Sequence, residues 1–107
     1  MSGEQNKIKV YESPVFKKAF KKLTENEKDA VDGEIDIIIE NPDIGTQKKG
    51  DLSYLWVHKF TLNNQQVLLG YSWKDTELEL YLLNFGSHEN FYQEAKSRRK
   101  ADLNIIR

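Results

Sequence analysis

The chain has 107 residues, with 16 basic and 17 acidic side chains, a formal net charge of −1 and a sequence pI of about 6.1. This length fits one domain, and 38% hydrophobic residues suffice for a single core. The absence of cysteine excludes disulfides, thiolate metal sites and cysteine nucleophiles, and it suits a reducing compartment. The near-neutral charge argues mildly against a nucleic-acid partner, because neutralising phosphates usually takes a basic excess.

Both the N-terminus and the hydropathy pattern favour a cytoplasmic protein. Residues 1–6 are polar and lack the cationic start and apolar run of a signal peptide, so we expect a flexible tail. No apolar run is long enough to cross a bilayer. We therefore predict one domain over residues 7–107.

The first 42 residues predict a strand followed by two helices. Residues 7–12 alternate with β-favouring types, as in a strand. Ser13 and Pro14 suit an N-cap and a first helical position, and apolar spacings of three and four extend that helix to about Leu23. Residues 24–27 form a capping-box pattern that starts a second helix, which ends before Pro42. The predicted buried face of this second helix consists of Val31, Ile35, Ile38 and Ile39.

The rest of the chain predicts an exposed loop, a three-stranded meander and a last helix. The loop covers residues 43–52, and from there the hydrophobic period changes to two. Strands are expected at 54–62, 65–73 and 77–85, with turns at 63–64 and 74–76, and the helix at 87–102. The order indicates an α+β fold.

The strand at 77–85 shows the alternation most clearly. Its leucines at 78, 80 and 82 are expected to face the helices. The opposite side would carry Glu79, Tyr81, Leu83 and Phe85, a mixed surface. With helices on one side of the sheet, we expect this second face to be free to bind a ligand.

The last predicted helix carries four polar side chains on one face. His88, Tyr92, Lys96 and Arg99 follow one another at spacings of four, four and three. Imidazole, phenol, ammonium and guanidinium groups in a row could serve acid–base chemistry and anion binding. A core tyrosine beside solvated cations is the competing interpretation, and spacing alone favours it.

The other histidine, His58, lies in the first strand of the meander beside Lys59. Adjacent strand residues point to opposite faces, so only one of these two can share a face with the start of the last helix. Glu79 and Glu89 could complete a two-histidine metal site, but no ligand spacing supports one. We predict no metal and no cofactor.

The order of elements, together with local motifs, resembles the RelE/ParE superfamily of toxins from bacterial toxin–antitoxin pairs. The resemblance extends from residue 7 to about residue 100. Its carriers are Ser-Pro-Val-Phe-Lys-Lys at 13–18, Asn-Pro-Asp-Ile-Gly at 41–45, and the longer segments at 50–60 and 83–92. The last two segments are specific when taken together.

The resemblance implies a metal-independent endonuclease that cuts mRNA in the ribosomal A site. In RelE-like members the ribose 2′-hydroxyl attacks the adjacent phosphate and the 5′-oxygen leaves, which needs a base, an acid and cations. In the branch with YafQ and HigB, histidines take over part of this work. By matching position, His88 falls on the family's C-terminal Arg or His and Tyr92 near its last-helix aromatic. Lys59 or His58 falls in the basic second-strand segment.

The resemblance also suggests phosphate-binding residues, partners and alternative activities. Gln66 takes roughly the place of an arginine in RelE, and its amide can hydrogen-bond a phosphate without neutralising it. The cations expected to compensate are Lys59, Lys96 and Arg99, with Lys48 and Lys49 on the loop. The implied partners are a cognate antitoxin, the ribosome and mRNA. A ParE-like DNA gyrase inhibitor and an inactive relative that still binds an antitoxin are the alternatives.

Overall fold

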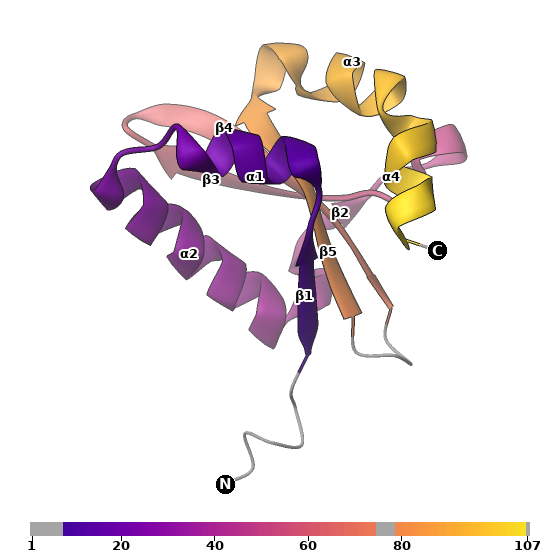
Figure 1. The fold of residues 1–107 in the computed structure, drawn as a ribbon, viewed down its shortest axis with the longest axis horizontal. Coiled ribbons are helices and arrows are strands. Elements are labelled where there is room, and N and C mark those ends of the chain that lie inside the picture. Colours follow the sequence, from indigo (N-terminus) through magenta and orange to yellow (C-terminus); the bar gives the residue numbers. More distant parts are fainter. Residues whose placement is uncertain (1–7, 75–78, 107) are drawn as a thin grey trace, which may run out of the picture.

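The computed structural model describes residues 8–74 and 79–106, which form a five-stranded sheet with helices on both faces (Figure 1). The strand order is β1-β5-β4-β3-β2. β1 (Lys9–Glu12) runs parallel to β5 (Glu79–Ser87). The antiparallel strands are β4 (Gln65–Lys74), β3 (Trp56–Leu62) and β2 (Thr46–Gln47). The predicted α+β class is confirmed.

Two helices, α1 (Pro14–Lys21) and α2 (Glu25–Glu40), begin at the caps that the sequence predicts. The Ser13 hydroxyl accepts a hydrogen bond from the backbone N–H of Phe16 at 3.0 Å and donates one to the carbonyl of Leu83 at 2.6 Å. Thr24 forms the expected capping box. Local sequence therefore fixes where both helices start, and Ser13 also ties α1 to β5.

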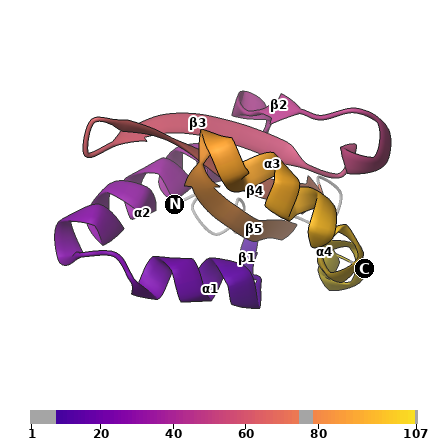
Figure 2. The same ribbon diagram turned by 90° about the horizontal axis from the view of Figure 1, so that it is seen from above.

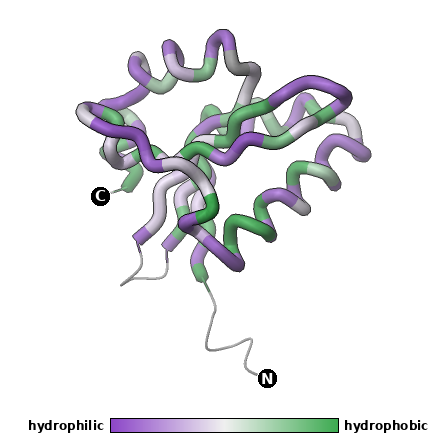
Figure 3. Tube along the Cα trace, turned by 180° about the vertical axis from the view of Figure 1, so that it is seen from behind, coloured by the Kyte–Doolittle hydropathy of each residue, from purple (hydrophilic) through white to green (hydrophobic). Residues whose placement is uncertain are grey.

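The sheet surface under α1 and α2, here called the hairpin face, carries the larger hydrophobic core (Figure 2). Hydrophobic and hydrophilic positions alternate along α2, as Figure 3 shows, so that one side of the helix can be buried. At the edge of this core, the Tyr71 hydroxyl donates a hydrogen bond to the carbonyl of Pro42 and accepts one from the N–H of Gly45. The fully or nearly fully buried members are Phe16, Val31, Ile35, Ile38, Leu69, Tyr71, Leu80 and Leu82.

The segment predicted as an exposed loop, residues 43–52, is more ordered than expected. It contains the short helices η2 (Pro42–Ile44) and η3 (Gly50–Leu52), with β2 between them. β2 pairs with the start of β3, and the Lys48 N–H donates to the carbonyl of Leu55 at 2.9 Å. The prediction missed this strand because two residues carry no periodicity, and the edge of β3 supplies the pairing.

The second sheet surface, here called the C-terminal face, is covered rather than open. α3 (His88–Ser97) packs over β5 and β4, and its Phe91 is 1% exposed. The expectation of a free second face is therefore wrong over the centre of the sheet. The buried members of this second core are Leu55, Val57, Leu68, Tyr81, Leu83, Phe91 and Ala95.

An irregularity in the pairing of β4 with β5 corrects the predicted orientation of Phe85. Gly70 pairs with Asn84 while Tyr71 pairs with Leu82, so Leu83 is an extra residue. This bulge reverses the alternation that follows it. Phe85 consequently packs on the hairpin face, with its ring 5.3 Å from that of Phe16.

The single predicted helix at 87–102 is wrong, because the chain forms α3 and then α4 (Arg99–Ile106). Arg98 separates the two helices with φ −98° and ψ 3°. The break lets α4 turn so that Ile105 and Ile106 pack against the C-terminal core. The predicted helix ended at residue 102, so these two apolar residues were not assigned to any element.

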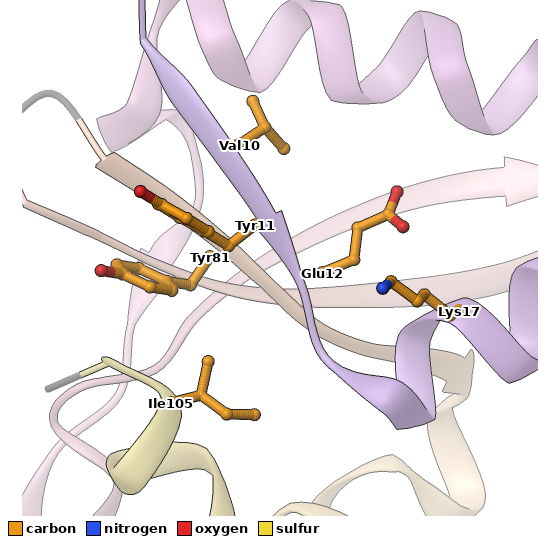
Figure 4. Close-up of a pocket in the computed structure, with 6 residues that line it drawn as sticks. All are labelled: Val10, Tyr11, Glu12, Lys17, Tyr81 and Ile105. Atoms are coloured by element: carbon orange, nitrogen blue, oxygen red, sulfur yellow. The ribbon is translucent and has the colours of Figure 1, made fainter.

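At the outer edge of the sheet, Tyr11 of β1 stacks on Tyr81 of β5 with ring centroids 5.0 Å apart (Figure 4). The predicted tail at 1–6, Leu78 and most of the predicted turn at 74–76 lie outside the described residues. Among the residues described, no helix is long and apolar enough to cross a membrane.

Candidate functional site

Lys59 and Gln66 lie on the C-terminal face, where α3 does not cover the sheet. Lys59 pairs with Leu68, which belongs to the C-terminal core, and Gln66 precedes Leu68 by two residues on the same strand. Paired residues and residues two apart share a sheet face. Both side chains are exposed. A cation and an amide donor therefore stand together on the surface of β3 and β4.

His58 points to the opposite, hairpin face. Its Nε2 lies 2.7 Å from Oε1 of Glu34 on α2, and its ring stacks on Phe60 with centroids 5.8 Å apart. Of the adjacent residues His58 and Lys59, only Lys59 therefore lies on the sheet face that α3 covers. The structure does not bring His58 together with the other candidate residues.

Tyr92 lies on α3, half-buried against the C-terminal core. Lys48, from the segment after β2, places its Nζ 4.9 Å from the centroid of the Tyr92 ring. A cation at this distance from an aromatic face is attracted by the ring and helps to fix its orientation. Phe91 holds the ring from another side in an edge-to-face contact at 5.2 Å.

Gly70 of β4 allows α3 to come this close. A Cβ at Gly70 would lie 2.7 Å from Cζ of Phe91 and 3.0 Å from a methyl carbon of Leu55. The 2.7 Å contact is shorter than real Cβ contacts, so a larger residue would force the Phe91 ring to shift. Because Phe91 precedes Tyr92 on α3, the position of Tyr92 depends on Gly70 beneath Phe91.

Three of the predicted phosphate-binding cations surround a surface hollow of about 460 Å³. Lys49 comes from the segment before η3, Lys96 from α3 and Arg99 from α4. Asp51 and Leu52 complete the lining. The Arg99 Nε–H donates to the backbone carbonyl of Asp51 at 2.8 Å, which holds the guanidinium at the hollow.

His88 is the first residue of α3, directly after the N-cap residue Ser87. Its side chain lies outside the described part of the structure, so its assignment as an acid or base stays a prediction. Ser87 makes no side-chain cap, and the backbone N–H groups of the first turn of α3 are not capped in that way. Among the residues described, no group of three or more His, Cys, Asp or Glu could hold a metal ion.

A buried polar cluster behind the hollow was missed by sequence reasoning. It consists of Tyr54, Arg98 and Asp102, and the Tyr54 hydroxyl, Arg98 Nε and Asp102 Oδ1 have no hydrogen-bond partner among the described residues. Burial raises the pKa of Asp102 to about 6, against a smaller lowering by Arg98. Burial, reinforced by the charge of Asp102, raises the pKa of Tyr54 to about 12.

One signal in the sequence could have indicated this cluster. Asp102 lies three residues before an Ile-Ile pair, where an amphipathic helix would place its buried side. A carboxylate at an apolar position is costly, so it marks a place where the packing is not purely structural.

The sheet order, the helical hairpin and the covering C-terminal helix define a RelE-like α+β fold. The free state of a double mutant of the E. coli toxin RelE matches with a TM-score of 0.65 at 19% identity, over 85% of this chain and 96% of that chain. RelE in the intact E. coli RelBE toxin–antitoxin complex matches with a TM-score of 0.61 at 16% identity, over 76% and 96%. At these identities the likeness concerns the fold alone.

The family follows from the sequence match. Residues 10–96 match the model of the ParE-like toxins of type II bacterial toxin–antitoxin systems. The chain belongs to this family. A search of curated proteins finds no match.

Proposed function

We propose that this protein is a ribosome-dependent mRNA endonuclease that inhibits translation, working without a metal and under the control of an antitoxin. The observation that supports the proposal is that Lys59 and Gln66 lie on the sheet face on which α3 packs with Tyr92, whose ring carries the Lys48 ammonium. Lys59 and Gln66 supply hydrogen-bond donors for a phosphate, which phosphodiester cleavage needs together with an acid–base residue.

In the proposed reaction the ribose 2′-hydroxyl gives its proton to a base and attacks the adjacent phosphorus. The bond to the 5′-oxygen breaks, leaving a 2′,3′-cyclic phosphate, and the departing 5′-oxygen receives a proton. His88 is proposed as the acid or base, because a histidine changes its protonation near neutral pH. Lys59 and Gln66 hold the phosphate oxygens, and Tyr92 positions the scissile group.

The hollow formed by Lys49, Lys96 and Arg99 supports a second, purely electrostatic role. Lys49 of the hollow follows Lys48 in the chain, and the Lys48 ammonium lies over the Tyr92 ring. The cations of the hollow are therefore near Tyr92. They offset the missing charge at Gln66 by attracting the RNA backbone. His58 has no role in this proposal, since it lies on the hairpin face against Glu34.

The decisive experiment is induction of the protein followed by mapping of mRNA ends, with and without translation. We expect new ends within translated codons, growth arrest, and loss of both in His88→Ala. The matched control is His58→Ala, which removes the other histidine and should still cleave. Cleavage that persists when translation is blocked would rule out the ribosomal mechanism, and a folded, fully active His88→Ala protein would remove the central residue.

A DNA gyrase inhibitor is the second candidate, and the match to ParE-like toxins is the observation that favours it. Inhibition of DNA supercoiling by purified gyrase, in the absence of any change in mRNA ends, would establish that activity instead. A protein that causes neither effect but still binds its antitoxin would be an inactive relative.

The proposed partner is a cognate antitoxin in the cytoplasm, where ribosomes and mRNA are available. RelE is found with its antitoxin in the RelBE complex and, as a mutant, with an antitoxin peptide. Co-expression of this chain with the neighbouring gene product should restore growth. Co-purification of the two chains would identify the complex.

A further inference from the structure

A hollow of about 400 Å³ lies between α1 and α3, at the end of β5. It is separate from the hollow at Lys49, Lys96 and Arg99, and the sequence analysis assigned it no role. Lys18 comes from α1 and Lys22 is the C-cap residue of that helix, while Asn84, Gly86 and Ser87 come from the end of β5. Its size is within the range of about 300–1,000 Å³ that ligand clefts occupy.

Asn84 is the feature that requires an explanation. It is only 6% exposed, it lines this hollow, and its amide nitrogen has no hydrogen-bond partner among the described residues. A buried amide without a partner costs on the order of 1–3 kcal/mol. Rotation of the amide about its last torsion presents its donor to the hollow, where a bound acceptor would satisfy it.

The charges of the lining specify an anion. Lys18 and Lys22 are cationic and Glu94 is acidic, which leaves the hollow positive. The uncapped first turn of α3 adds backbone N–H groups and the positive end of a helix dipole. Together with the Asn84 amide these donors line one hollow, which favours a ligand with negatively charged acceptor oxygens.

Two further groups favour a nucleotide over a simple carboxylate. Phe85, which is partly exposed, lines the hollow and offers an aromatic surface against which a base can pack. The Glu94 carboxylate on the α3 wall can accept a hydrogen bond from a ribose hydroxyl. A segment of Asp and Glu residues alone has neither a flat ring nor a hydroxyl to use these groups.

The hollow continues a row of residues that crosses the sheet from the candidate site. Lys59 pairs with Leu68, and Leu68 pairs with Gly86. Gly86 lines the hollow and lies two residues before the start of α3. Leu68 itself is buried under α3. A single strand would therefore pass beside this row, over the exposed Gln66 and Ser87 at the start of α3, from Lys59 toward the lysines of α1.

We propose that the α1–α3 hollow is a second RNA subsite, which binds the phosphate and base of a nucleotide flanking the one at Lys59. This inference rests on the proposed RNA substrate, but it concerns binding and not cleavage. Lys18, Lys22 and the Asn84 amide hold the phosphate, and Glu94 holds the ribose. The subsite therefore sets how the RNA strand is aligned with α3.

The test compares two double variants that remove the same charge from the same helix. Lys18→Gln with Lys22→Gln changes the hollow. Lys17→Gln with Lys21→Gln does not, because Lys17 lines a different hollow beside Glu12 at the β1 edge (Figure 4). The probe is a fluorescein-labelled RNA of about ten nucleotides with unmodified riboses, which keeps the hydroxyl that Glu94 would bind; the proposed cleavage needs the ribosome, so this free RNA stays intact.

By fluorescence anisotropy at low salt, we expect the first double variant to bind about tenfold more weakly and the control about twofold. Asn84→Asp, which replaces the donor by a carboxylate of the same size, should weaken binding at least as much as the first double variant. In the parent protein, the Asn84 side-chain amide resonances should shift on adding this RNA.

Equal losses in the two double variants, or unmoved Asn84 resonances, would overturn the subsite. So would an effect of Lys18 and Lys22 on binding a glutamate-rich peptide with none on RNA, which would make the hollow a peptide site. A protein that shows the expected binding pattern but leaves cellular mRNA intact would contradict the proposed cleavage and leave the subsite standing.

Discussion

The hairpin face and the C-terminal face of the same sheet are built in different ways. On the hairpin face, the polar groups at the margins are paired, as with the Tyr71 hydroxyl on Pro42 and Gly45 and the ring of His58 on Glu34. On the C-terminal face, the Tyr54 hydroxyl, Arg98 Nε and Asp102 Oδ1 are buried without a hydrogen-bond partner in the part of the chain that the structure describes. One face stabilises the fold, whereas the other retains costly groups next to its cations, as expected where function constrains the packing.

The largest effect should come from the hairpin face. Phe16→Ala removes a fully buried ring that contacts Phe20 and Phe85, and should lower the free energy of unfolding by about 3–5 kcal/mol. Urea denaturation measures the loss. Phe20→Ala, at a half-buried position of the same helix, is the control and should cost clearly less; an equal cost would contradict the assignment of Phe16 to the centre of this core.

The next largest effect is an increase in stability, and it is expected at Asp102 on the C-terminal face. The pKa of Asp102 in the folded protein is raised to about 6 from an ordinary 3.8. Between these values the folded state keeps a proton that the unfolded state has lost, so stability falls as the pH rises from about 4 to about 6. Asp102→Asn removes the buried charge and should stabilise the protein at pH 7.5 by on the order of 2 kcal/mol.

Urea denaturation of both proteins across pH 4 to 8 tests this prediction. As the pH rises from about 4 to about 6, the free energy of unfolding of the parent protein should fall relative to that of the Asn variant. Parallel pH profiles of the two proteins would show that Asp102 does not titrate between these pH values in the folded state.

A smaller change in stability is expected for His58→Gln, on the hairpin face. Loss of the contact with Glu34 should cost about 1 kcal/mol, because the pair is partly exposed. RNA cleavage in cells should be unchanged. Loss of cleavage in a protein that remains folded would return His58 to the candidate site and blur the division between the two faces.

The smallest effect on stability should accompany a larger effect on function. Lys48→Gln removes the cation over the Tyr92 ring and should change the free energy of unfolding by less than about 1 kcal/mol. Cleavage, or binding of the labelled RNA, should nevertheless fall several-fold as the ring loses its orientation. Lys28→Gln is the matched control, since its Nζ lies 5.9 Å from the Phe20 ring on the other side of the sheet.

Sequence reasoning predicted what depends on neighbouring residues. The caps at Ser13 and Thr24 and the turn at Asn63-Asn64, where φ is 53° and 64°, use short-range hydrogen bonds and backbone preferences. What it missed depends on residues far apart in the chain. The bulge at Leu83, the two-residue strand at Thr46 and the turn of α4 exist because distant segments supply their partners.

In the candidate site, too, the features that the sequence did not predict depend on residues far apart in the chain. The pairing of Lys59 with Leu68 gave its face only once the register of β3 and β4 was known. The meeting of Lys49 with Lys96 and Arg99 depends on how the segment before η3 lies against α3 and α4, far away in the sequence. Residue types could suggest the chemistry, but only tertiary contacts decide which side chains share a surface.

The parallel pairing of β1 with β5 has a consequence for how the chain folds during synthesis. Ser13 caps α1 and also bonds to Leu83, 70 residues later. β3, β4 and β5 follow one another and can pair as they emerge, whereas the first strand has to wait for the last one. Assembly of the sheet is therefore completed only after β5 has been synthesised, so the first strand of a growing chain stays without its neighbour until then.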